Sequence, residues 1–387
     1  MIHLGGIKKM AELDLGEIRA KLDDIDKKIS DTFEERMNLC KKVAEYKISV
    51  GKRVFDKERE NQKLDAVENL AANDFMKQCN RDLFGQIMAM SRRLQYGCVS
   101  EHEKSDLYGF KKVDSIPKDN IRVVYQGVEG AYSQAAMWQY FGHDVDAYNV
   151  ELWRDAMEDV KNGKADYGVF PIENSTAGSV NDVNDLLIEY DNYIVGEVVL
   201  KISHALLGLE DSDISDIKKI YSHPQALMQS QAFLNSNRKW QQISMKNTAG
   251  AAKKVLEDND ITQAAVASVY AAKVYGLKVL KECITDTDVN ATRFIVVANK
   301  KIYEKNANKI SICFTLPNES GTLYNILGNF VYNHLNMTKI ESHPTKNERW
   351  AYNFFVDFEG SLEDMKVKNA LYAIENEASS FKLLGNY

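Results

Sequence analysis

No proline occurs before Pro117, so nothing in the backbone interrupts a helix over the first hundred residues of the chain. Asp14 can cap a helix there, with Glu17 three residues later as a capping-box partner. Apolar residues then recur at heptad spacing, which is typical of a helix that packs against another helix. This seam consists of Leu15, Ile18, Leu22, Ile25, Ile29, Leu39, Val43 and Tyr46. We therefore expect an all-α domain over residues 12–98, with a second copy of the chain supplying the partner helix.

Charged residues interrupt this helical pattern where apolar ones would be expected. Arg36 lies on the seam, seven residues from both Ile29 and Val43, and Lys47 lies one turn beyond Val43. A buried, unpaired cation costs several kcal/mol, so Arg36 alone suggests only a salt bridge or a bend that exposes it. Near the end of this segment Phe84, Ile87 and Met88 define an apolar helical face, and Ser91 and Gln95 continue it. Before it, Asp56 and Glu60 can share a helix face, with Arg59 beside them. Together they favour an anion-binding pocket inside a helical bundle.

From residue 121 the pattern changes, after a polar linker at 99–120, to short β-branched runs that alternate with helical stretches. The expected strands are 121–125, 167–172, 194–200, 217–221, 264–269 and 294–298. This alternation predicts an α/β domain with mainly parallel sheets over residues 120–300. The remaining residues, 308–387, predict the order strand, helix, strand, strand, helix, strand of an α+β ferredoxin-like domain.

Four predicted strand-to-helix turns in the middle segment carry glycines or hydroxyl caps that expose backbone N–H groups. They are 127–133, 171–178, 222–225 and 247–251. Such turns favour carboxylates and phosphates, but each alone is also explained by an ordinary tight turn, and His223 by a structural turn histidine. No Gly-x-Gly-x-x-Gly fingerprint for a dinucleotide is present.

Composition limits the function classes. The net charge of −7 argues against a general nucleic-acid binder. The five cysteines are scattered without zinc-site spacing, so we expect reduced core thiols and no metal. Met1–Met10 lacks the apolar stretch of a signal peptide, and no segment approaches the ~18 apolar residues of a membrane span. We expect a cytoplasmic protein.

Residues 12–97 resemble the all-helical chorismate mutases that are fused to prephenate dehydratase. The matching positions are Arg19, Arg36, Lys47, Asp56, Arg59, Glu60, Ser91 and Gln95. The resemblance implies that chorismate rearranges to prephenate without a cofactor, by positioning and electrostatics. It implies that Arg36, Arg59 and a partner subunit's Arg19 hold the two carboxylates, assisted by Ser91. Lys47 and Gln95 would donate to the ether oxygen, and Asp56 and Glu60 would orient the ring hydroxyl.

The middle segment resembles prephenate dehydratase through Pro171-Ile172-Glu173-Asn174, Ser222-His223-Pro224-Gln225, Asn247-Thr248-Ala249 and Thr292-Arg293-Phe294. That family folds like two-lobed periplasmic binding proteins, with the substrate between the lobes. The resemblance implies that Thr292 protonates the departing hydroxyl of prephenate, which loses carbon dioxide and gives phenylpyruvate. The residues that would line the cleft are Glu173, Asn174, Ser175, Thr176, Ser222, Gln225, Thr248, Arg293 and Phe294.

The C-terminal segment resembles the ACT domain that binds L-phenylalanine in these enzymes. Gly321, Leu323, Glu341 and Ser342 match its two regulatory turns, whereas Thr322 and His343 replace the family's alanine and arginine. The resemblance implies a feedback-regulated homodimer or higher homo-oligomer. A domain that only dimerises the chain is the alternative.

Two other classes of function compete with this enzyme. A two-lobed solute-binding protein would use its ends for assembly, but it has no need of cations in the helical seam. A ligand-responsive regulator of transcription would need a helix-turn-helix with a basic face, and none stands out.

Overall fold

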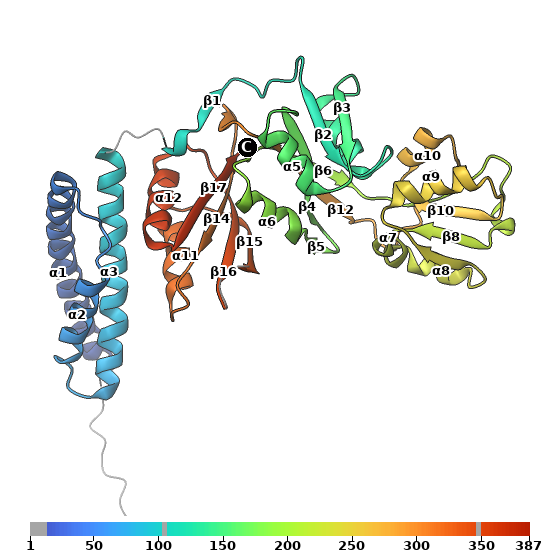
Figure 1. The fold of residues 1–387 in the computed structure, drawn as a ribbon. Helices are drawn as coiled ribbons and strands as arrows, with labels where there is room; N and C mark the ends of the chain where they lie inside the picture. Colours follow the sequence, from blue (N-terminus) through green and yellow to red (C-terminus); the bar gives the residue numbers. More distant parts are fainter. Residues whose placement is uncertain (1–13, 103–106, 346–349) are drawn as a thin grey trace, which may run out of the picture. The chain divides into compact units, whose positions relative to one another are not determined.

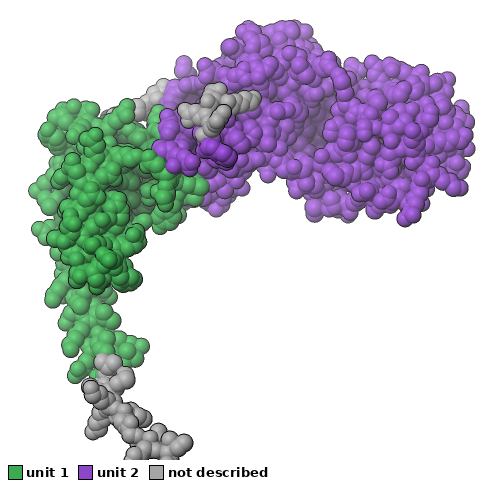
Figure 2. All heavy atoms as spheres, turned by 60° about the horizontal axis from the view of Figure 1, so that its bottom comes forward, with its two compact units in different colours: residues 1–105, 319–334, 365–378 green, residues 106–318, 335–364, 379–387 purple. Residues whose placement is uncertain are grey.

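The computed structural model describes residues 14–102, 107–345 and 350–387, which form the two compact units coloured separately in Figure 2. Unit 1 comprises the described part of 1–105 with 319–334 and 365–378. Unit 2 comprises the described part of 106–318 with 335–364 and 379–387. Met1–Met10 and the expected start of the first domain at residue 12 lie outside the described residues.

Unit 1 is entirely helical in the described residues. Its helices are α1 (Leu15–Val50), α2 (Lys57–Glu68), α3 (Asp74–His102), α11 (Thr322–Tyr332) and α12 (Met365–Glu377). The predicted cap is confirmed, because the Asp14 carboxylate accepts hydrogen bonds from the backbone N–H groups of Gly16 (2.7 Å) and Glu17 (3.3 Å). Helix α1 ends where Gly51 adopts a left-handed conformation with φ +67°.

The heptad seam of α1 is exposed within the chain. Its residues range from 37% exposed at Ile18 to 63% at Tyr46. Helix α3 packs along α1 and α2 through another face, where Met88, Ser91 and Gln95 are buried. The expected continuation of the α3 face through two polar residues is therefore confirmed.

Unit 2 contains two α/β lobes, each with its own sheet (Figure 1). The first lobe is built from β2 (Arg122–Gln126), α4 (Tyr132–Phe141), β3 (Asp146–Val150), α5 (Trp153–Lys161), β4 (Tyr167–Asn174), β5 (Gly178–Ser179), α6 (Asn181–Glu189), β6 (Tyr193–Lys201) and β12 (Ala291–Ala298). Its strand order is β6-β12-β4-β2-β3. Hydrophobic clusters fill both faces, with Phe170 and Val124 on one side and Met137 and Val123 on the other.

The second lobe lies between β6 and β12 in the sequence, so the chain crosses between the lobes twice. It consists of β7 (Ala205–Gly208), β8 (Lys219–Ser222), α7 (Pro224–Gln229), α8 (Gln231–Ser236), β9 (Gln241–Ser244), α9 (Thr248–Asp258), β10 (Gln263–Ala267), α10 (Val269–Tyr275) and β11 (Lys278–Lys281). Its sheet order is β11-β7-β10-β8-β9. A short parallel pair, β1 (Lys111–Val113) with β13 (Ile302–Glu304), joins the segments on either side of the two lobes.

Four further strands extend the sheet of the first lobe. They are β14 (Lys309–Thr315), β15 (Met337–Pro344), β16 (Tyr352–Glu359) and β17 (Ser380–Asn386). They lie in the order β15-β16-β14-β17 with antiparallel neighbours, and β17 meets β6 in parallel at Gly385 and Ile194 (Figure 1). The predicted element order of residues 309–387 is confirmed.

The sheets differ from the expected mainly parallel arrangement. β2 pairs in parallel with β3 and β4, and β8 pairs in parallel with β9 and β10. β12 runs antiparallel to β4 and β6, and β7 runs antiparallel to β10 and β11. The antiparallel strands are those next to the two crossings, where the chain leaves one lobe for the other instead of making a helical crossover.

Two local expectations are wrong. Val269 begins helix α10 instead of ending a strand, because the Ser268 hydroxyl accepts a hydrogen bond from the N–H of Ala271 (3.0 Å). The segment at 171–178 is no strand-to-helix turn, since β4 continues through Pro171 to Asn174 and pairs with β5.

The five cysteines are free, as expected, but they are not all core residues. Cys313 is buried, Cys283 is exposed, and the other three are half-buried. Across residues 14–102, 107–345 and 350–387, no helix has both the length and the apolar content that crossing a membrane requires.

Candidate active sites

A cavity of about 120 Å³ opens among the three N-terminal helices. Its lining residues are Arg36, Cys40, Lys47, Val54, Asp56, Arg59, Glu60, Met88, Ser91, Arg92 and Gln95. We call it the N-terminal cavity. It brings together seven of the eight residues expected in the helical domain, from α1, the start of α2 and α3.

Two of the cavity's cations face neutral partners. Arg36 donates from Nη1 to the hydroxyl of Ser91 (2.5 Å), and Lys47 donates from Nζ to the backbone carbonyl of Val54 (2.5 Å). Burial lowers the pKa of Lys47, although Asp56 and Glu60 partly oppose this effect. In the described residues no carboxylate forms an ion pair with Arg36, Lys47 or Arg59, so positive charge remains available to an anion.

The two carboxylates of the cavity are already engaged. Asp56 caps α2 by accepting from the N–H of Arg59 (3.1 Å), which holds the pKa of Asp56 below its usual value, and it lies 3.5 Å from the ammonium of Lys52. Glu60 forms an ion pair with Arg92. Gln95 donates to the carbonyl of Ser91 (3.2 Å), while its buried Oε1 has no hydrogen-bond partner in the described part of the chain.

Arg19 is the expected residue that the structure does not bring to the cavity. It is exposed on α1, the same continuous helix that carries Arg36. At a rise of ~1.5 Å per residue, the two arginines are separated by roughly 25 Å along the helix axis. Arg19 of one chain therefore does not reach the cavity that contains Arg36 of that chain.

A second group of polar residues surrounds the start of β12 in unit 2. Asn174 donates from Nδ2 to the hydroxyl of Thr292 (2.9 Å) and to Oδ1 of Asn290 (2.9 Å). The Oδ1 of Asn174 accepts from the backbone N–H and the hydroxyl of Thr176 (3.1 and 2.8 Å). In the described residues the Thr292 hydroxyl accepts but donates to no protein group, so its proton is available to a ligand.

This group continues into the second lobe, and we call the whole chain of contacts the interlobe network. Gln229 of α7 donates from Nε2 to the hydroxyl of Thr176 (2.8 Å), and its Oε1 lies 3.1 Å from Nε2 of His204. His204 follows the first crossing, and its Nδ1 lies 3.1 Å from the hydroxyl of Tyr132. Burial lowers the pKa of His204, which favours a neutral ring that links the two lobes.

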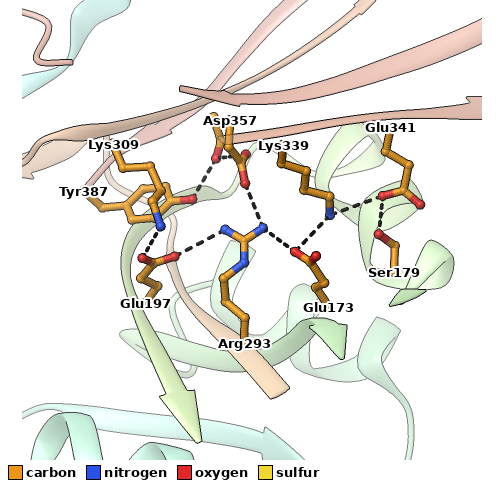
Figure 3. Close-up of polar contacts among 10 residues, drawn as sticks. Glu173, Ser179, Glu197, Arg293, Lys309, Lys339, Glu341, Asp357 and Tyr387 are labelled. Atoms are coloured by element: carbon orange, nitrogen blue, oxygen red, sulfur yellow. Dashed lines mark hydrogen bonds and ion pairs between the residues drawn. The ribbon is translucent and has the colours of Figure 1, made fainter. Parts of the chain in front are cut away.

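Arg293, next to Thr292, lies in a separate ionic cluster (Figure 3). Its guanidinium is 2.7 Å from Asp357 on β16, 3.1 Å from Glu173 and 3.3 Å from Glu197. Burial lowers the pKa of Arg293, but the charge of Asp357 and the other neighbouring groups raise it by more, so its net pKa lies above the ordinary arginine value. The cluster therefore ties β12 to β16.

The strand register separates these two groups. Thr292 pairs with Asn174, and Arg293 pairs with Glu173. Because successive side chains of a strand point to opposite faces, Thr292 and Asn174 share one face while Arg293 and Glu173 share the other. Lys339 extends the second face, at 3.7 Å from Glu173 and 3.2 Å from Glu341 (Figure 3).

The other residues expected to bind the second substrate have varied surroundings. Phe294 is buried in the core of the first lobe, and Ser222 is fully buried with its hydroxyl donating to the carbonyl of Val266 (2.5 Å). Ser175 is exposed and donates to the carbonyl of Val289 (2.8 Å). Gln225 and Thr248 are half-buried in the first turns of α7 and α9.

Comparison with known proteins identifies both halves. Residues 18–96 match the family model of chorismate mutase type II, and residues 123–302 match that of prephenate dehydratase. Over 381 residues the chain is 33% identical to a bifunctional chorismate mutase/prephenate dehydratase of Aquifex aeolicus, covering 97% of this chain and 98% of that protein. The chain belongs to the bifunctional chorismate mutase/prephenate dehydratases. It is an enzyme with both activities, a mutase in its N-terminal helices and a dehydratase in its two lobes.

Relatives also match the dehydratase part alone. An arogenate dehydratase/prephenate dehydratase of Arabidopsis thaliana is 38% identical over 278 residues, covering 69% of this chain and 72% of that protein. A prephenate dehydratase of Arthrobacter aurescens, solved in complex with L-Phe, has a TM-score of 0.65 at 29% identity. That match covers 69% of this chain and 90% of the solved one.

Several polar residues of the two groups were not predicted from sequence. They are Arg92 in the mutase part and Asn290, Gln229, His204 and Tyr132 in the dehydratase part. Arg92 follows Ser91 directly, and Asn290 precedes Thr292 by two residues, so proximity to a motif was the only available signal. Gln229 lies one turn after Gln225 on α7, and no local pattern distinguishes it.

The lowered pKa of Lys47 predicts how mutase turnover depends on pH. If its ammonium acts on the substrate, turnover should fall as pH rises through a pKa below the ordinary lysine value of 10.5, because the neutral amine carries no charge. A Lys47→Arg variant stays protonated, so whatever activity it retains should lose this alkaline limb. Rate profiles from pH 6 to roughly 10 would show it. The exposed Lys41→Arg exchange on α1 serves as the control, and an unchanged limb in Lys47→Arg would contradict the assignment.

Proposed function

We propose that the N-terminal cavity binds chorismate through the cations that the protein leaves without carboxylate partners. Arg36 and Arg59 would hold the carboxylates, since a planar guanidinium can bind a carboxylate through two hydrogen bonds. Ser91 would assist them, and it already orients Arg36. This proposal rests on the observation that Arg36, Lys47 and Arg59 line one cavity and form no ion pair with a carboxylate in the described residues.

The other residues of the cavity are assigned roles from the charge that develops on the substrate during the rearrangement. As the ether bond breaks, negative charge grows on its oxygen, and Lys47 and Gln95 would donate to it in a partly buried site where electrostatic interactions are strong. Asp56 and Glu60 would orient the ring hydroxyl, and their existing contacts with Lys52 and Arg92 hold both carboxylates in place. The reaction is unimolecular, so no nucleophile or cofactor is required.

A second copy of the chain would complete this site. The exposed seam of α1 offers a long apolar face for another α1 helix, and Arg19 of the same chain does not reach the cavity. We infer that a partner subunit's Arg19 reaches it in a homodimer. Light scattering at assay concentrations is the measurement, and a fully active monomer would contradict this inference.

In the dehydratase, Thr292 would be the acid that protonates the departing hydroxyl of prephenate. Loss of that group and of carbon dioxide makes the ring aromatic, so one well-placed proton donor and a site for the carboxylates suffice. Asn174 supports this role, because its amide donates to Thr292 and leaves the threonine proton for the substrate. The helix N-termini that begin at Pro224 on α7 and at Thr248 on α9 are candidate carboxylate sites.

Two assays test the pair of activities. Chorismate should be consumed without added metal or nucleotide, which its ultraviolet absorbance measures. Phenylpyruvate should then form from supplied prephenate. A folded protein that consumes neither substrate would overturn the proposed function.

We also propose that residues 308–387 form an ACT domain that senses L-phenylalanine. In this division of the chain, residues 12–98 form the mutase domain and residues 120–300 the dehydratase domain. The antiparallel order β15-β16-β14-β17 supports a ferredoxin-like fold. The Arthrobacter relative was solved with L-Phe. Gly321, at φ +84° before α11, and Leu323 represent the first regulatory motif, whereas Glu341 and Ser342, expected in a second turn, lie within strand β15.

Calorimetry with L-phenylalanine tests the sensor. We expect saturable binding together with reduced dehydratase turnover, since feedback requires the ligand to bind one conformational state better than another. His343 replaces the family's arginine, and its Nδ1 lies 3.1 Å from Oδ1 of Asp185. No heat at millimolar ligand would refute the sensor and leave a domain that serves assembly only.

A further inference from the structure

Arg92 is a buried cation held between two carboxylates, one in the mutase site and one far along the sequence. Its side chain is 8% exposed and forms ion pairs with Glu60 and, through Nε at 2.9 Å, with Glu377. Glu377 is the last residue of α12, and its side chain is 10% exposed. One guanidinium therefore connects a residue of the substrate cavity to the C-terminal segment.

The geometry of these contacts allows Arg92 to hold the Glu60 side chain in place. Nη1 of Arg92 faces Glu60 while Nε faces Glu377, so the two contacts together fix the plane of the guanidinium. Burial lowers the pKa of Arg92, but the carboxylates of Glu377 and Glu60 raise it more strongly, and Arg92 stays charged. The ring of Phe55, 5.0 Å from the guanidinium carbon, covers it further.

Helix α12 packs against the wall of the same cavity. Tyr372 meets Tyr96 of α3 edge to face, with ring centroids 5.7 Å apart, and Ala373 packs with Val54 and Val99 in one apolar cluster. Val54 is also the residue whose carbonyl accepts from Lys47. The apolar contact between α3 and α12 thus includes Val54, which lines the cavity.

We propose that Glu377 is a positioning residue for the mutase reaction, which holds Glu60 in place through Arg92. This inference rests on the proposed mutase role of the N-terminal cavity. Without Glu377, Arg92 keeps a single carboxylate anchor and is free to turn about it, and Glu60 turns with it. The ring hydroxyl of chorismate then loses a fixed partner during the rearrangement.

The test is a Glu377→Gln exchange in the full chain. The amide keeps the size of the side chain and removes its charge. We expect mutase kcat to fall about 10-fold, because small displacements at a reacting centre have large effects on rate. KM for chorismate should change little, since the arginines that hold its carboxylates are untouched. Dehydratase turnover of supplied prephenate should stay unchanged and reports that the chain is folded.

A double-mutant cycle separates positioning from general loss of structure. If Glu377 acts through Glu60, the loss in Glu60→Gln/Glu377→Gln should be no larger than in Glu60→Gln alone. Two independent losses that multiply would overturn the proposal. Asn369→Ala is the matched control, because Asn369 joins α12 to Ser100 of α3 away from Arg92. Equal mutase loss in Asn369→Ala would show that docking of α12, not Glu377, matters.

Single variants distinguish a failure of this proposal from a failure of the proposed mutase function. If Arg36→Ala abolishes mutase turnover while Glu377→Gln leaves kcat at the wild-type value, only the positioning role fails. If the wild-type chain does not consume chorismate at all, the proposed mutase site fails first.

Discussion

An Arg36→Ala variant should lose mutase turnover by about 100-fold or more while it converts supplied prephenate at the wild-type rate. Removing one preorganised charge partner from a reacting site typically lowers the rate by about this factor. Arg36 lines the N-terminal cavity and is held by Ser91, so its loss removes the proposed partner of a substrate carboxylate and also leaves that hydroxyl without its cation. Both kcat and kcat/KM should fall, because substrate carboxylates need the charge throughout the reaction.

The control is Lys41→Ala, which removes an exposed cation from the same helix. It should leave both activities intact, which shows that the effect of Arg36→Ala is local and not a consequence of the net charge. Chorismate absorbance and phenylpyruvate formation measure the two activities separately. If Arg36→Ala destroyed both in a folded protein, the division of the chain into two catalytic parts would be wrong.

The N-terminal cavity could be predicted from sequence because its signals are local. A cation on an apolar helical seam contradicts the pattern around it, although only the whole set of polar residues, and not Arg36 alone, predicts an anion-binding pocket. Ser91 and Gln95 stand out for the same reason, since they continue an apolar face and are indeed buried. Arg92 carries no such signal. Its importance depends on Glu377, nearly three hundred residues away, and helical periodicity does not predict which distant residue pairs with a charge.

The dehydratase lobes show the opposite situation. The motifs there predicted the dehydratase region correctly. Side chains alternate along β4 and β12, however, so neighbouring residues of one motif lie on different faces of the sheet. Thr292 and Asn174 share one face, whereas Arg293 and Glu173 form an ionic pair on the other. The pairing register decides this division, and it depends on contacts between strands more than a hundred residues apart. Direct substrate contact by Arg293 and Glu173 stays a prediction.

The mixed sheets have a related cause. Each predicted strand could be recognised from its own residues, but its direction in the sheet depends on where the chain enters the lobe. β12 returns from the second lobe and inserts between β4 and β6 in the antiparallel sense. Alternation of helices and strands predicted parallel pairing because it assumes a continuous βαβ path, and the two crossings break that path.

A Thr292→Ala variant should show the reverse of Arg36→Ala. Dehydratase turnover should fall by about 100-fold or more, the usual contribution of a positioned proton donor, while mutase turnover stays unchanged. The Thr292 hydroxyl accepts from Asn174 and, in the described residues, donates to no protein group, so its proton is placed for the substrate. Alanine removes that proton without disturbing the Arg293 cluster on the opposite face.

Thr292→Ser decides between an acid and a structural hydroxyl. Serine keeps the oxygen that accepts from Asn174 and the proton that would reach prephenate, so it should retain much of the dehydratase activity. If alanine were as active as serine, the proton must come from another group, and Thr292 would not be the acid. If serine and alanine were equally inactive in folded protein, the methyl group of Thr292 would matter instead, and β12 would serve to shape the site and not to supply its acid.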